Sequence, residues 1–129
     1  MREILFRAKR IDNGEWGFGD LWHNNSETMI IDQPATIEYD VIPETVGQFT
    51  GLTDKNGKKI FEGDIVKEND IFHNGELQIR GNTWEVVYAD GLFFANFKDI
   101  SVYLQSLDGI EVIGNIHDNP ELMRKEDEK

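Results

Sequence analysis

Short runs of alternating apolar and polar residues follow one another along this chain, separated by five Asn-Gly or Asp-Gly pairs. Asn, Asp and Gly tolerate the positive φ angles of tight hairpin turns, and a strand points successive side chains to opposite faces. The pattern therefore predicts an all-β protein built as a meander of short strands. The five pairs stand at positions 13–14, 56–57, 74–75, 90–91 and 108–109.

The clearest predicted hairpin joins Trp84–Tyr88 to Leu92–Phe97 through Asp90-Gly91, because aromatic and β-branched residues occupy both arms. Helix is expected only in Lys98–Leu107 and in a short turn where Asn119 caps and Pro120 takes the first helical position. Further strands are expected at residues 4–8, 15–22, 28–31, 36–42, 64–67 and 110–114.

Three segments are expected along the chain. Residues 1–42 should form an N-terminal β-subdomain, residues 43–123 a C-terminal β-barrel, and residues 124–129 a flexible charged tail. The boundary is set near Ile42-Pro43, because proline cannot donate to a strand ladder. Since no Gly/Ser-rich linker separates the first two segments, we expect them to pack together.

Three stretches resemble the YopX family of phage and prophage proteins: the core Gln48–Val66, the opening Ile4–Ala8 and the closing Val112–Leu122. The likeness extends over essentially the whole chain. It implies a small all-β protein encoded by a phage or prophage, with a partly open barrel of the SH3-like type in its C-terminal part. It implies no particular activity.

The charge disfavours several kinds of partner. The net charge is −12, and residues 11–123 hold only six basic residues against 21 acidic ones. Such a surface repels phosphate backbones and anionic membranes, so we expect no tight binding to duplex DNA. There is no cysteine, no apolar run of signal-peptide length and no membrane span, which together predict a cytoplasmic protein of the bacterial host.

Two acidic motifs could carry acid/base chemistry. Glu62-Gly63-Asp64 pairs two carboxylates, which could also bind a divalent ion, but we favour a tight corner in which Asp64 accepts hydrogen bonds from turn backbone. Asp118 follows His117 where a strand ends, and we favour capping of backbone N–H groups over catalysis there.

Other motifs lack the context that chemistry needs. His23, His73 and His117 have no metal-ligand spacing, and Gly17-Phe18-Gly19 lacks the third glycine of a dinucleotide loop. The sequence therefore predicts no catalytic residue, no metal site, no cofactor and no enzyme. The remaining candidates without context are the basic turn Gly57–Lys59 and the serines Ser26, Ser101 and Ser106.

A basic stripe could form beside aromatic stacking faces. In the first strand Ile4, Phe6 and Ala8 are expected on one face, with Arg7 and Lys9 on a solvated face. The stripe would comprise Arg2, Arg7, Lys9, Arg10, Lys55, Lys58 and Lys59, with Trp16, Phe18 and Trp22 as stacking faces. Solvated turns and core packing are the commoner roles for such residues.

The favoured function is a non-enzymatic accessory module that binds itself or a host or phage protein, with uncapped strand edges and exposed aromatics driving homo-oligomer formation. The alternative is a nucleic-acid-associated protein that uses the basic N-terminal strand. A small hydrolase ranks third. No partner-binding residue can be assigned from the sequence.

Overall fold

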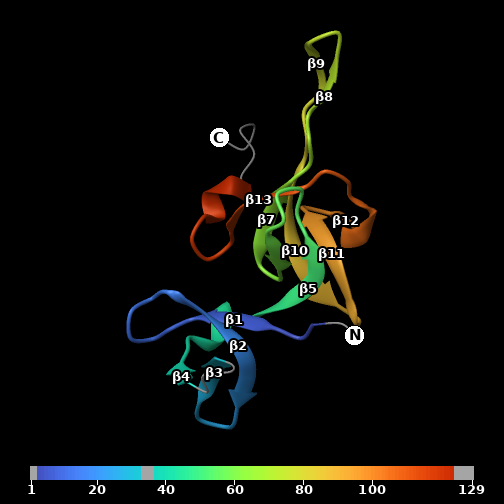
Figure 1. Ribbon diagram of the computed structural model, residues 1–129. Coiled ribbons are helices and arrows are strands. Elements are labelled where there is room, and N and C mark those ends of the chain that lie inside the picture. Colours follow the sequence, from blue (N-terminus) through green and yellow to red (C-terminus); the bar gives the residue numbers. More distant parts are fainter. Residues whose placement is uncertain (1–2, 33–36, 124–129) are drawn as a thin grey trace. The chain divides into compact units, whose positions relative to one another are not determined.

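The computed structural model describes residues 3–32 and 37–123, which divide into two compact units at Gly51/Leu52. Strands account for 56% of the fold and short helical turns for 9%, and the paired strands run antiparallel. The predicted all-β class is confirmed (Figure 1).

The first unit is a sheet with the strand order β4-β3-β2-β1-β5. Its hydrophobic core gathers on one face around Ala8, Ile30 and Val41. The elements are β1 (Phe6–Lys9), β2 (Trp16–His23), β3 (Thr28–Asp32), β4 (Ile37–Asp40), the 3-10 turn η1 (Pro43–Thr45) and β5 (Gly47–Thr53).

The expected faces of β1 are wrong in one respect, because Arg7 is buried with 7% of its surface exposed while Ile4 is 62% exposed. β1 is a central strand, paired with β2 on one side and β5 on the other. The guanidinium carbon of Arg7 lies 4.5 Å from the centre of the Trp16 ring. The long aliphatic stem and planar cation of an arginine can be covered in this way. The charge of Arg7 was therefore not enough to predict that its side chain is exposed.

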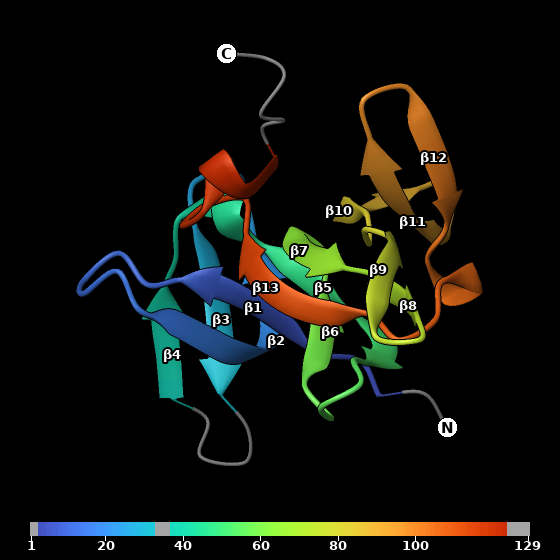
Figure 2. The same cartoon turned by 90° about the horizontal axis from the view of Figure 1, so that it is seen from above.

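The second unit is built on a five-stranded sheet with the order β12-β11-β10-β7-β13. Figure 2 shows β10, β11 and β12 in succession, as in Figure 1. The core centres on Ile60, Val66, Trp84 and Val86. The elements are β6 (Lys59–Phe61), β7 (Asp64–Lys67), β8 (Ile71–His73), β9 (Glu76–Ile79), β10 (Thr83–Ala89), β11 (Leu92–Phe97), β12 (Ile100–Tyr103), η2 (Leu104–Ser106), β13 (Glu111–Asn115) and η3 (Pro120–Met123).

Two Asx-Gly pairs form the tightest hairpins. Asn74 and Gly75 have φ values of 53° and 80°, and Asp90 and Gly91 have 51° and 80°. Positive φ at both central residues matches the twist of the flanking strands. The predicted β10–β11 hairpin is thus confirmed, whereas Asp108-Gly109 precedes β13 without forming a hairpin.

The helical turn expected within residues 98–107 is confirmed for only a small part of that range. Residues 100–103 form β12, and only Leu104–Ser106 make a 3-10 turn. Lys98 adopts a φ of 54° and turns the chain from β11 into β12, a position that glycine or asparagine more commonly takes. The pairing of β12 with β11 outweighed the local helical preference.

A buried carboxylate ties the β5–β6 turn to β13. One oxygen of Asp54 accepts hydrogen bonds from the backbone N–H groups of Asn56 and Lys58, and the other accepts one from Val112, all at 2.9 Å. Burial alone would raise the pKa of Asp54, but the three N–H donors together outweigh it and hold the pKa below its usual value.

The division between the units falls after Gly51 rather than after Ile42. β5 pairs with β1 through Gly47 and Gln48, so the segment that follows Pro43 belongs with the N-terminal sheet. The five-stranded sheet shows no closure in the described residues, so the SH3-like barrel stays a prediction. Residues 124–129, the predicted tail, lie outside the described residues.

Candidate interaction surface

A hairpin of β8 and β9 projects beyond the five-stranded sheet (Figure 1). We call residues 70–80 the arm. Its two strands form a separate two-stranded sheet, in which Phe72 lies opposite Leu77 and Ile71 opposite Ile79. Every residue of β8 and β9 is exposed, with 60% of the surface of Phe72 and 58% of that of Ile79 open to solvent.

The base of the arm is fixed by several bonds. The backbone N–H of Glu68 donates to the carbonyl of Asn82 at 2.9 Å, and the N–H of Gly81 donates to the Asp70 carboxylate at 2.7 Å. The indole N–H of Trp84 donates to the Glu68 carboxylate at 3.0 Å. A side chain at Gly81 would collide with the Glu68 carbonyl, so glycine is needed there. The arm therefore starts from an anchored base.

This arrangement is suited to association. An isolated two-stranded hairpin is only marginally stable in water, and large exposed apolar groups are typical of surfaces at which chains associate. Within the described part of the chain, β8 and β9 pair only with each other. Their outer edges therefore keep backbone groups that can accept a further strand.

A pocket of about 300 Å³ with a mixed apolar and polar lining lies beside the base of the arm. Trp84, Phe97, Ile100 and Leu122 supply its apolar lining, and Arg80 from the arm lies at its edge. Ile100 is 57% exposed, whereas Trp84 reaches into the core and is only 6% exposed. The pocket thus opens from the surface onto the hydrophobic core of the second unit.

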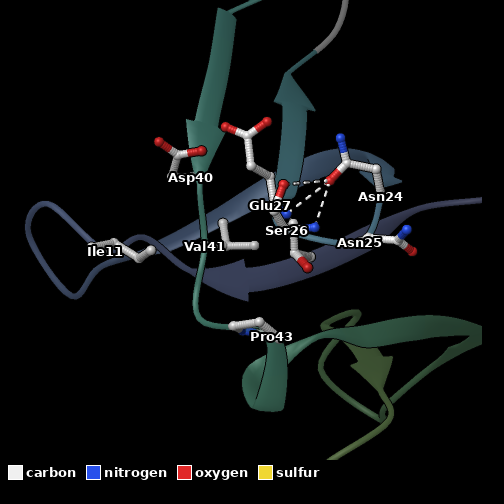
Figure 3. A pocket seen from close by; sticks show the side chains of 9 residues that line it. Ile11, Asn24, Asn25, Ser26, Glu27, Asp40, Val41 and Pro43 are labelled. Atoms are coloured by element: carbon white, nitrogen blue, oxygen red, sulfur yellow. Dashed lines mark hydrogen bonds between the residues drawn. The ribbon is translucent and has the colours of Figure 1, made fainter.

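A larger, polar pocket of about 430 Å³ lies in the first unit (Figure 3). Its Asn24 oxygen accepts hydrogen bonds from the backbone N–H groups of Ser26 and Glu27, both at 2.9 Å, and from the Ser26 hydroxyl at 3.3 Å. These groups close the turn between β2 and β3. The serine and the amide that face this pocket are therefore already engaged in local structure.

The Glu62-Gly63-Asp64 motif forms a corner, as expected. Asp64 is 1% exposed and accepts a 2.7 Å hydrogen bond from the backbone N–H of Phe61. Gly63 has a φ of 93°, which favours glycine. The predicted backbone role of Asp64 is confirmed.

The polar groups after β13 also bind backbone. The Asn115 side-chain oxygen accepts from the N–H groups of His117 at 3.0 Å and Asp118 at 2.9 Å, and the Asn115 amide donates to the Asp118 carboxylate at 3.2 Å. Asn119 was expected to cap the final turn, but its side-chain oxygen accepts a hydrogen bond from the backbone N–H of Asn115 at 3.2 Å. Asn115 is thus the principal turn-closing residue, and the sequence did not single it out.

The other candidates are dispersed over the fold. His23 lies in β2, His73 in β8 and His117 after β13, and residues 3–32 and 37–123 contain no cluster of three metal-type ligands. Gly17 and Gly19 lie inside β2, where a side chain at Gly19 would collide with the Ile31 carbonyl of β3. Gly57–Lys59 turns from β5 into β6, Ser101 lies in β12, and the Ser106 hydroxyl donates to the Tyr103 carbonyl at 2.6 Å.

The basic stripe is divided between the units. Lys55, Lys58 and Lys59 belong to the second unit, and Arg2 lies outside the described residues. In the first unit, Arg7 and Lys9 lie 4.5 and 5.6 Å from the centre of the Trp16 ring.

Arg10 has similar partners within its own unit. It stacks 4.1 Å from the Tyr39 ring and forms a 2.7 Å ion pair with Asp12. This ion pair raises the pKa of Arg10 and lowers that of Asp12. Phe18 and Trp22 of β2 remain 45% and 42% exposed.

Comparison with known proteins identifies the family. Residues 5–124 match the family described as YopX protein. The chain belongs to the YopX family. The crystal structure of protein EF1440 from Enterococcus faecalis is similar, with 33% sequence identity, a TM-score of 0.65, and coverage of 96% of this chain and 100% of that one. No curated protein sequence matches. The resemblance seen in the sequence is confirmed.

Over residues 3–32 and 37–123, none of the helices has the length and apolar character that crossing a bilayer requires.

Proposed function

We propose that this YopX-family chain is a non-enzymatic, self-assembling accessory module of a phage or prophage, acting in the cytoplasm of the bacterial host. The observation that carries the proposal is the arm, which holds Ile71, Phe72, Leu77 and Ile79 in water on an anchored base. A host or phage protein is the other kind of partner that could cover the same surface.

Burial of the arm would supply a useful free energy. Covering the exposed part of each large apolar side chain contributes about 1 kcal/mol, so a symmetric pair of arms gains roughly 8 kcal/mol from eight such groups. Association costs on the order of 4–15 kcal/mol in lost freedom. The apolar gain is comparable with that cost, and strand pairing at the edges or further contacts must add the surplus.

A partly open SH3-like barrel in the second unit is part of this proposal. Ile60 of β6 packs into the same core as Val66 of β7 and Trp84 of β10, so β6 covers a face of the five-stranded sheet. Two layers around one core are what a small barrel requires. This barrel would be the rigid body that presents the arm.

Molar mass by light scattering, measured from low to high micromolar protein, tests the self-association. We expect the wild type to exceed the 14.9 kDa of one chain and Phe72→Ser/Leu77→Ser to return to it. Phe18→Ser/Trp22→Ser is the matched control, because these aromatics of the first unit have comparable exposure. Wild-type protein that stays at the mass of one chain at every concentration would refute the proposal.

Nucleic-acid binding by the N-terminal strand is a second candidate, favoured by one observation. Arg7 pairs with Phe18 and Lys9 with Trp16 across β1 and β2, which places two cations and two aromatics on one face of the sheet. Of the two cations, Arg7 is buried, so Lys9 is the one that a ligand could reach. Cations beside aromatic rings are typical of single-strand binding surfaces.

The charge of the chain weighs against this candidate, and we expect no shift of duplex or single-stranded DNA at submicromolar protein in a mobility-shift titration. Retardation that fades with salt and is lost in Arg2→Ala/Arg7→Ala/Arg10→Ala would favour the nucleic-acid function instead.

A further inference from the structure

The arm has two strand edges, one along β8 and one along β9, and the two edges are not equivalent. We infer that two copies of the chain pair along β8, antiparallel about a two-fold axis that passes beside Phe72. The two arms then form one four-stranded sheet in the order β9-β8-β8-β9. This inference rests on the proposed self-association and names the edge and the register that produce it.

The edge along β9 is interrupted by a bulge. Ile71 lies opposite Ile79 and Phe72 lies opposite Leu77, so Gln78 is an extra residue on β9. A bulge bends its strand and disturbs the spacing of the backbone groups, and it is one of the ways in which proteins protect a strand edge from pairing. β8 has no extra residue. β8 is therefore the edge that can accept a second strand in regular register.

The turn determines which backbone groups of β8 face outward. In a hairpin with a two-residue turn the flanking residues, here His73 and Glu76, are the hydrogen-bonded pair. The next pair, Phe72 and Leu77, is then a non-hydrogen-bonded one, so the backbone N–H and C=O of Phe72 point away from β9. No other strand of the described residues lies along this edge. Two copies can therefore exchange these groups across the two-fold axis.

This register also aligns apolar side chains. Phe72 of each copy lies opposite Phe72 of the other, and Phe72 shares a face with Leu77 of its own chain. The joined sheet thus carries a row of four apolar side chains, Leu77 and Phe72 from each copy, whose neighbours are close enough to pack together. A lone hairpin is marginally stable in water, whereas a sheet of three or more strands with an apolar face is not.

Charge favours the same register. Asp70 comes to lie opposite the neutral Asn74 of the other copy, and it is paired with Lys67 of its own chain at 3.7 Å. The two Glu76 carboxylates lie on the outer strands, separated by both copies of β8. Moving the axis to Ile71 would instead place each Asp70 opposite a Phe72 and would break the apolar row.

Disulfide trapping tests this register, because the chain has no cysteine of its own. Ile71 of one copy and His73 of the other would be a non-hydrogen-bonded pair with Cα atoms about 4.5 Å apart, which a disulfide can bridge. A mixture of Ile71→Cys and His73→Cys chains should therefore form a covalent dimer under mild oxidation. Neither variant alone should do so, since the two equivalent positions lie roughly 8 Å apart.

Ile79→Cys is the matched control for Ile71→Cys. Ile79 and Ile71 pair with each other in the arm and are 58% and 53% exposed. Ile79 is on β9, however, so β8 separates it from the other copy. Its mixture with His73→Cys should stay monomeric on a non-reducing gel.

Two substitutions at Phe72 separate backbone pairing from apolar contact. Phe72→Leu keeps the backbone N–H and an apolar side chain, and should associate within about threefold of the wild type. Phe72→Pro lacks the N–H and should weaken association about tenfold or more, because it removes both hydrogen bonds exchanged across the axis. Proline is tolerated where the N–H of an edge strand faces solvent, so the single chain should still give a β-type circular dichroism spectrum.

The outcomes separate this inference from the proposed function. Association without the cross-link between Ile71→Cys and His73→Cys, or with equal weakening in Phe72→Leu and Phe72→Pro, would overturn pairing along β8 and leave self-assembly standing. A cross-link between Ile79→Cys and His73→Cys would also overturn it, because it would place β9 at the contact. A wild-type chain that does not associate would refute both the inference and the proposed function.

Discussion

Two hairpins of the second unit share their turn chemistry and differ in almost everything else. β10–β11 turns at Asp90-Gly91 and β8–β9 at Asn74-Gly75, with φ values that agree within a few degrees. Val86 and Ala95 of the first hairpin are fully buried, whereas both strands of the second are exposed throughout. Turn residues therefore determine where a hairpin forms and do not determine what covers it.

The difference lies in the neighbouring strands. β10 and β11 are flanked by β7 and β12, and their inner face packs on the core around Ile60. β8 and β9 have no further strand beside them in the described part of the chain. An apolar side chain on β10 thus contributes to folding, and one on the arm is available for association. The following changes separate these two roles.

The largest effect is expected where a turn is tied to the core. Asp54→Ala removes the acceptor of three backbone N–H groups and should lower the free energy of unfolding by about 3 kcal/mol in a urea titration. Asp70→Ala at the base of the arm is the control and should lower the free energy of unfolding much less than Asp54→Ala does. Equal losses in the two variants would contradict the distinction.

The same residue predicts a dependence on pH. The pKa of Asp54 is lowered in the folded state, so its contribution is fully present above the ordinary carboxyl range. This stabilisation by Asp54 is lost as the pH falls through the ordinary carboxyl range toward the lower pKa of the folded state. Urea titrations at several acidic pH values should show stability that falls less steeply in Asp54→Ala than in the wild type.

The next largest difference is expected between the effects of truncating a core side chain and an arm side chain on the free energy of unfolding. Val86→Ala should cost about 2 kcal/mol, because it removes buried methyl groups from the centre of β10. Ile79→Ala removes more atoms but should change the stability of the single chain by within about 0.5 kcal/mol. Both values come from urea unfolding at a concentration where one chain is the main species. A larger loss in Ile79→Ala would mean that the arm belongs to the folding core.

The two turn glycines provide a matched pair. Gly91→Ala and Gly75→Ala impose the same strain at a φ of 80°, and neither new methyl group meets an atom within 4 Å. Gly91→Ala should lower global stability by about 1 kcal/mol. Gly75→Ala should leave it unchanged, because the arm can open locally, and hydrogen exchange should instead accelerate in β8 and β9.

The smallest effect is expected at Glu85 of β10. Burial raises its pKa, so the charged form is disfavoured in the folded state and stability from this group declines as the pH rises through the folded pKa. Glu85→Gln should raise the free energy of unfolding at neutral pH by no more than about 0.5 kcal/mol. This gain should vanish at pH values below the range in which carboxyl groups ordinarily titrate. Thermal unfolding at two pH values would measure it.

The alternation of residues and the Asx-Gly pairs predicted most of the strands, the β10–β11 hairpin and the corner at Asp64. They did not predict the burial of Arg7, which depends on Trp16 and on β5 beside it. Nor did they predict β12, which forms through its pairing with β11. The burial of Arg7 and the formation of β12 both depend on contacts with other strands, which the local sequence pattern does not show.

The arm shows the same limit at the candidate site. Its Asn74-Gly75 turn was recognised, but Phe72 and Leu77 read like any other strand residues. A half-buried strand and an uncovered one have the same alternation, and only the three-dimensional arrangement shows that no other described strand lies beside this hairpin. The apolar residues on both strands around a short turn were the one available signal.

Sedimentation velocity of an arm-shortened chain tests the central claim most directly. Deleting residues 71–73 and 76–79 joins Asp70 to Arg80 through the intact Asn74-Gly75 turn and leaves the buried core residues untouched. We predict that the wild type sediments as an oligomer that dissociates on dilution. The shortened chain should sediment as a single chain, lighter than the 14.9 kDa of the full chain by its seven missing residues, with a circular dichroism spectrum that is still of the β type. A folded, shortened chain that associates as strongly as the wild type would contradict the assignment of self-assembly to the arm.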